Sequence, residues 1–266
     1  MEELGTIALV SLLCGLAGFI DSIAGGGGLI SLPAFLLTGL PTHIAAGTNK
    51  VAAFLGTSTA VATFARDGRI VWPEALSGTV GALLGSAVGA QVAVWLPEHL
   101  FRVLLVCVLP LVAGFLLVRG LPEPSEEELA GLKAVRSRAL WHRLSVSAAM
   151  GLGIGLYDGL VGPGTGTFLI IASVLLLRLP LVTSSANAKV INFASDVASA
   201  SVFMWHGSCS YRHAVPAALC AMVGCYLGVR YCLRFGSRGI RAMLCVVLAL
   251  LFASLVYDLL RTFAVL

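Results

Sequence analysis

Residues 18–50 read GFIDSIAGGGGLISLPAFLLTGLPTHIAAGTNK, and four consecutive glycines, Gly25 to Gly28, interrupt their apolar run. Glycine in a helix interior costs about 1 kcal/mol relative to alanine, so four in succession predict that a helix ends there. Irregular backbone at membrane depth is tolerated only where protein or a water-filled cavity surrounds it. The stretch therefore predicts a membrane-buried helix that is broken part of the way across.

The composition of the whole chain agrees with a membrane protein. Of the 266 residues, 58% are hydrophobic and 11% are charged, whereas soluble domains carry about 25% charged residues. The apolar runs are continuous, which favours helices and not the alternating strands of a barrel. The fold class expected is all-α, a polytopic membrane helical bundle. The expected segments are 5–24, 29–38, 44–65, 75–95, 101–118, 144–161, 166–177, 183–205, 213–233 and 240–260.

An internal repeat relates the two parts of the chain. A shift of 137 positions matches Asp21 with Asp158, and a shift of 139 matches Lys50 with Lys189. Matches of charged residues between apolar segments are less common by chance than matches of Leu or Val, so the repeat indicates a duplication. Further matched positions are Gly18/Gly155, Gly25/Gly162, Gly27/Gly164, Phe64/Phe203, Gly85/Gly224 and Gly89/Gly228.

The distribution of basic residues favours halves of opposite orientation. If each half crosses the membrane four times, the 17 Lys and Arg residues divide almost evenly between the two sides. If the glycine break makes five legs per half, 13 of them fall on one side, as the positive-inside rule expects. We therefore expect inverted repeats at 1–119 and 143–266, a cytoplasmic hydrophilic linker at 120–142, and both termini outside a bacterial inner membrane.

The second half repeats the break at 162–166, which reads Gly-Pro-Gly-Thr-Gly. Paired interrupted segments at matching places are the best sequence pointer to a transporter site. The half-helices that begin near Leu29 and Thr167 should present backbone N–H groups and a partial positive charge to an anion. The alternative is close helix packing through small residues. The expected substrate-binding glycines and threonine are Gly25, Gly26, Gly27, Gly28, Gly162, Gly164, Thr165 and Gly166.

Two lysines follow the breaks, in Thr48-Asn49-Lys50 and in Asn187-Ala188-Lys189. Ionisable residues inside a membrane indicate function by default, and the alternative is a lysine that snorkels to the interface. We predict that Lys50 and Lys189 attract an anion, and that Thr48, Asn49 and Asn187 donate hydrogen bonds to it.

Aspartates occupy a second matched pair of positions. Asp21 and Asp158 could carry a proton, pair with the lysines or cap the broken backbone, since each role avoids an unpaired buried carboxylate. The remaining alternative is a solvated position at the membrane interface. Asn192, Ser195 and Asp196 follow Lys189 at helical spacing and are further candidates for the lining of a cavity.

Several function classes find no support in the chain. It lacks the motifs of hydrolases, the spacing of Cys or His in metal sites, and the clustered basic face of a nucleic-acid binder. We expect no enzyme activity, no cofactor, no metal and no nucleic-acid partner, but a small anionic substrate and the lipid bilayer. The sequence is compatible with an oligomer.

Residues 18–50 and the second copy from Gly155 to Gly207 resemble the TauE/SafE family of sulfite exporters. The glycine run, the following proline and Thr48-Asn49-Lys50 carry the resemblance, whereas the second copy departs in its Gly-Pro-Gly-Thr-Gly break and in Asn187-Ala188-Lys189. The resemblance implies a secondary transporter of sulfite, a sulfonate or a related organosulfur oxyanion. Alternating access between the halves is the expected mechanism, and a passive anion channel or a non-transporting scaffold are the alternatives.

Overall fold

The computed structural model describes residues 2–101, 103 and 139–264. The expected segment 101–118 and the linker predicted at 120–142 lie almost wholly outside these residues. The described part contains helices joined by short loops and no β-strand. The expectation of an all-α bundle is therefore confirmed.

The helices follow the predicted segments closely, including both breaks. The first half contains α1 (Glu2–Ala24), α2 (Gly28–Leu36), α3 (Thr42–Arg66) and α4 (Trp72–Trp95). The second half contains α7 (Leu140–Leu160), α8 (Thr165–Leu176), α9 (Leu181–Trp205) and α10 (Tyr211–Ala264). A kink at Gly236, where φ is +58°, divides α10 into two helical parts.

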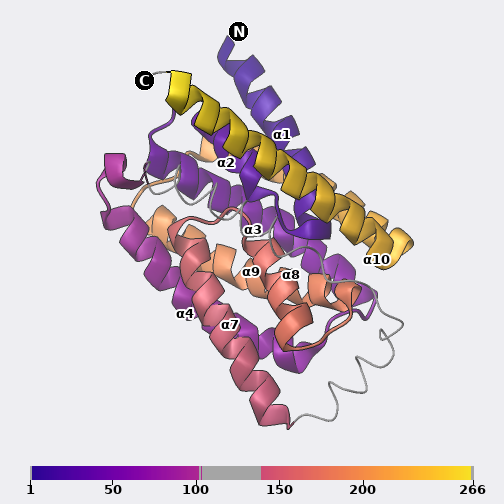
Figure 1. The fold of residues 1–266 in the computed structure, drawn as a ribbon. Helices are drawn as coiled ribbons and strands as arrows, with labels where there is room; N and C mark the ends of the chain where they lie inside the picture. The colour runs from indigo at the N-terminus through magenta and orange to yellow at the C-terminus, as the bar shows by residue number, and fades with distance from the viewer. Residues whose placement is uncertain (1, 102, 104–138, 265–266) are drawn as a thin grey trace.

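The bundle has two inner helices and two outer helix pairs (Figure 1). α3 and α9 lie between the pair α1–α10 and the pair α4–α7. Three stretches among the described residues are long and apolar enough to cross a membrane: Leu4–Ala24 in α1, Trp72–Trp95 in α4, and Tyr211–Ile240 in α10, which includes the kink. Their outward faces expose large apolar side chains such as Leu12, Leu84 and Leu219, which a bilayer would cover.

Small residues let the outer pairs approach closely. Gly81, Gly85 and Gly89 lie along one face of α4, and a Cβ added at any of them would stand within 2.2 Å of a carbonyl oxygen of α7. The pair α1–α10 uses the same device, since a Cβ at Gly224 would meet the carbonyl oxygen of Gly15 at 1.9 Å. Such spacing of small residues is typical of helix contacts in membranes.

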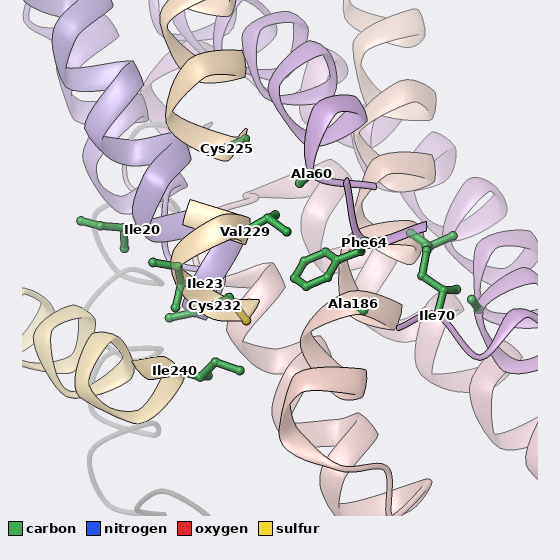
Figure 2. Close-up of a cluster of buried hydrophobic side chains, with 13 residues drawn as sticks. Ile20, Ile23, Ala60, Phe64, Ile70, Ala186, Cys225, Val229, Cys232 and Ile240 are labelled. Carbon is green, nitrogen blue, oxygen red and sulfur yellow. The ribbon is translucent and has the colours of Figure 1, made fainter. Parts of the chain in front are cut away.

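A buried apolar cluster fixes the inner helices against the α1–α10 pair (Figure 2). Phe64 of α3 and Ala186 of α9 are fully buried there, together with Ile23 of α1 and Val229 of α10. Because interiors are packed as densely as organic crystals, this cluster holds the four helices in a defined register.

The two inner helices run antiparallel. Thr48 near the start of α3 accepts a hydrogen bond from the amide of Ser210, just after α9 ends, at 2.9 Å. Asn187 near the start of α9 accepts one from the amide of Val71, just after α3 ends, also at 2.9 Å. Inverted halves require this arrangement of the matched helices α3 and α9. How each half is oriented relative to the bilayer stays a prediction.

Candidate functional site

The two helix breaks lie against each other in the middle of the bundle. The amide of Thr167 donates to the carbonyl oxygen of Gly25 at 3.2 Å, and the Thr167 hydroxyl donates to that of Ala24 at 2.8 Å. Gly25 has φ +82°, and a Cβ there would stand 2.1 Å from the carbonyl carbon of Gly166. Only glycine satisfies both the left-handed conformation and this close approach. The four-glycine run is therefore explained at Gly25 by a backbone-to-backbone contact between the halves.

A cavity of about 60 Å³ opens beside this crossing. That volume has room for a few water molecules or a small oxyanion. Polar side chains and glycines from α1, α3, α7 and α9 and from both breaks form its wall. The predicted site residues that line it are Asp21, Gly25, Gly27, Gly28, Asn49, Lys50, Asp158, Gly162, Gly164, Thr165 and Gly166.

Lys50 is the cation in the wall of this cavity, and two carboxylates hold it. Its Nζ lies 2.7 Å from Asp158 on α7 and 3.1 Å from Asp196 on α9. All three residues are buried, with 6% exposure for the lysine and 2% for each aspartate. Ser195 donates to Asp158 at 2.5 Å and Asn192 donates to Asp196 at 2.8 Å. Every charge in this group thus has a partner, as buried charges require.

Lys189 lies behind the wall and not in it. Its Nζ is fully buried and lies 2.7 Å from Asp21 of α1. The other oxygen of Asp21 accepts a hydrogen bond from the Gly27 amide at 3.2 Å, so this carboxylate also caps the first break. Neither lysine reaches the ends of its helix to snorkel.

Two ion pairs of the site cross between the halves in a matched way. Lys50 of the first half pairs with Asp158 of the second, and Lys189 of the second half pairs with Asp21 of the first. The repeat matches Lys50 with Lys189 and Asp21 with Asp158. The two pairs are therefore equivalent under exchange of the halves. Together they connect the two halves on either side of the helix breaks.

Three predicted site residues besides Lys189 lie outside the cavity wall: Gly26, Thr48 and Asn187. The Thr48 hydroxyl donates to the carbonyl oxygen of Ile44 at 2.6 Å and accepts from Ser210. The Asn187 amide makes two hydrogen bonds with the backbone of Val71, at 2.9 and 3.2 Å. These two matched residues join each inner helix to the loop before the opposite outer helix.

Two polar side chains of α3 face the cavity with their hydrogen-bonding groups free. Asn49 and Thr57 line it, are 7% and 2% exposed, and form no hydrogen bond with the described part of the chain. Together with Ala53 they occupy one face at i, i+4 and i+8. Buried polar groups are nearly always satisfied, so free ones beside a cavity indicate a ligand or water.

The sequence did not single out Thr57, Ser31 or Cys225 as lining residues. Each lies inside an apolar helix, where a lone Ser, Thr or Cys is common and carries no distinguishing pattern. Of the three further candidates on α9, Asn192 and Asp196 line the cavity as expected from their helical spacing to Lys189, whereas Ser195 does not.

The chain resembles membrane transporters over nearly its whole length. Residues 10–255 match the model of the family described as "Sulfite exporter TauE/SafE". A probable membrane transporter protein of Haemophilus influenzae is 32% identical over 258 residues, covering 96% of this chain and 97% of that protein. The probable membrane transporter protein YfcA of Escherichia coli is 30% identical, covering 96% and 90%.

A third relative, the probable membrane transporter protein ORF9 of Sinorhizobium sp., is 31% identical and covers 91% of this chain and 89% of its own length. No solved structure matches the fold. The buried ion pairs and paired helix breaks thus occur in a chain whose relatives are named as membrane transporters and not as enzymes. On this evidence the chain is a membrane transporter and belongs to the TauE/SafE sulfite exporter family.

Proposed function

We propose that this transporter moves sulfite, a sulfonate or a related organosulfur oxyanion across the bacterial inner membrane by alternating access. The observation that carries the proposal is the position of Lys50, a buried ammonium in the wall of the cavity beside both helix breaks. The family description names sulfite, and the relatives' names give no substrate.

The groups around the cavity suit an oxyanion with several oxygens. Lys50 supplies positive charge, while the free Asn49 amide and Thr57 hydroxyl supply hydrogen-bond donors from the same helix. The glycine wall leaves room for an anion near the starts of α2 and α8, where the amides of Gly27 and Thr167 already donate to Asp21 and Gly25. Charge-assisted hydrogen bonds of this kind are shorter and stronger than neutral ones.

The contacts between the breaks suit a mechanism that moves one half against the other. Each half contributes a break, a lysine and an aspartate, and the ion pairs join the two halves. When the cavity opens to the other side of the membrane, each half would take over the contacts that the other half made before. The roles of Asp21 and Asp158 as proton carriers stay predictions, since both are engaged with lysines.

Uptake into proteoliposomes tests the proposal. We would measure flux of sulfite, thiosulfate, taurine and sulfoacetate with and without a pH gradient. At least one of these anions should enter faster than in protein-free liposomes, and Lys50→Met should abolish the flux. Arg66→Met is the matched control, because Arg66 is an exposed cation at the end of the same helix. Flux that survives Lys50→Met at the wild-type rate would remove the substrate assignment.

The same assay separates the alternatives. A passive channel would show flux that saturates weakly and is not accelerated by counter-substrate on the far side. A scaffold would show no flux with any of the anions, while Lys50→Met changed its assembly with other proteins. Acceleration by counter-substrate is the result that alternating access predicts.

A further inference from the structure

We propose that Asp196 binds the proton that is carried together with the anion. The inference rests on the proposed function and adds a coupling site to it. The proton would add to a carboxylate oxygen of Asp196 from water on one side and return to water on the other, with no other bond changed.

Asp196 is the charge that breaks the symmetry of the site. The shift that matches Lys50 with Lys189 places Asp196 opposite Thr57, which also lines the cavity. The symmetric part of the site, two lysines and two aspartates, is therefore balanced in charge, and Asp196 adds one carboxylate with no added cation.

The local geometry shows the imbalance directly. One ammonium, that of Lys50, lies between two carboxylates at 2.7 Å and 3.1 Å. Asp158 has the closer contact and also accepts from the Ser195 hydroxyl at 2.5 Å. Asp196 has the longer contact and otherwise accepts only the neutral Asn192 amide among the described residues. Of the two carboxylates, Asp196 is the one whose charge is less well compensated.

The charged and titratable side chains that line the cavity with Asp196 are Lys50 on α3, Asp158 on α7, Asp21 and Cys14 on α1, and Cys225 on α10. Lys189 on the same helix is bound to Asp21. In the described part, α2, α4 and α8 bring no titratable side chain to the cavity wall. With both lysines and the three aspartates ionised and the cysteine thiols neutral, the formal charges of these groups sum to one negative charge.

This sum explains why an anion would need a proton. A monoanion added to the fully ionised site would bury a second uncompensated negative charge, which a low-dielectric interior strongly disfavours. If Asp196 takes a proton as the anion binds, the loaded site has the same net charge as the empty one. Proton and anion binding then favour each other, as thermodynamic linkage requires.

Infrared difference spectroscopy on the full-length protein in liposomes tests the proton site without any substrate. Acidification of the wild type should produce a carboxylic acid C=O band from a buried group, and Asp196→Asn should remove that band. Asp67→Asn is the matched control, because Asp67 is exposed in the loop after α3. A buried-acid band that persists unchanged in Asp196→Asn would overturn the inference.

Transport provides the second measurement. With whichever of the four anions the wild type carries, an inwardly directed proton gradient should drive accumulation. Asp196→Asn should exchange the anion between the two sides but lose the gradient-driven accumulation. Equal accumulation by the variant, or accumulation driven by a sodium gradient alone, would contradict proton binding at Asp196. Absence of wild-type flux would instead contradict the proposed function. The infrared experiment would still test proton binding at Asp196, because it needs no substrate.

Discussion

The ammonium of Lys50 in the first half is bound at 2.7 Å by the carboxylate of Asp158 in the second half. The matched pair, Lys189 and Asp21, repeats the exchange at the same distance. Each half thus keeps its buried lysine only because the other half supplies the carboxylate. This reciprocity couples the stability of the bundle to the geometry of the site.

The first prediction concerns the Lys189–Asp21 pair. Breaking a buried pair by removing one partner costs about 3–5 kcal/mol. Asp21→Asn should cost more than Lys189→Met, because the lysine left behind is fully buried while the Asp21 side chain is 19% exposed. The double variant should lose less than the sum of the single losses. Unfolding free energies in mixed micelles measure this, and strictly additive losses would argue against the pair.

The contact between the breaks predicts a specific effect at Gly25. Gly25→Ala should abolish transport while the protein still inserts, because the new methyl would push Gly166 away. Gly39→Ala is the control, since φ there is +78° but nothing lies within 4 Å of the added Cβ. The left-handed strain, about 1–2 kcal/mol, is common to both variants. Equal transport activity of the two variants would show that the contact does not matter.

Close packing of α4 on α7 predicts a stability effect remote from the cavity. Gly85→Ala should destabilise the protein by about 1–3 kcal/mol, because its Cβ would stand 2.1 Å from the carbonyl oxygen of Leu152. Gly153→Ala on α7, with open space around the added Cβ, should be neutral or slightly stabilising. Thermal unfolding in detergent compares them, and a Gly85→Ala protein as stable as the wild type would contradict the contact.

Two asparagines should give opposite phenotypes. Asn187→Ala should lower stability by about 1–3 kcal/mol with little change in KM, because it removes both bonds to Val71. Asn49→Ala should leave stability intact and raise KM about 10-fold, because its free amide faces the cavity. The unfolding free energy and KM should be measured for both variants. A raised KM for Asn187→Ala would mean that this residue contacts the substrate after all.

Inversion of the halves predicts opposite accessibility at matched loop positions. Asp67 follows α3, His206 follows α9, and both are exposed. In a cysteine-free background, Asp67→Cys should react with an impermeant thiol reagent from the cytoplasmic side and His206→Cys from the outside. Labelling of both from one side would mean that the halves have the same orientation and would remove the inverted model.

The amino-acid sequence determined the features that depend on composition and local backbone preference. Continuous apolar runs require helices in a bilayer, and the glycines at 25–28 end one of them whatever surrounds it. The repeat placed two lysines and two aspartates at matched positions, because a duplication is visible without coordinates. The sequence also led us to expect Thr48 and Asn187 at the substrate. A polar residue near a buried lysine gives the same sequence pattern whether its side chain faces a cavity or binds a backbone group.

Only the tertiary structure decided which groups meet. The crossing of Lys50 to Asp158 and of Lys189 to Asp21, and the contact of Gly25 with Gly166, join segments from opposite halves of the chain. Local preference contains no information about such pairings, because they depend on the direction in which α3 and α9 pass each other. The same packing turns Thr48 and Asn187 toward loops. It also brings Asp196 to Lys50, and this one extra carboxylate gives the site its net negative charge.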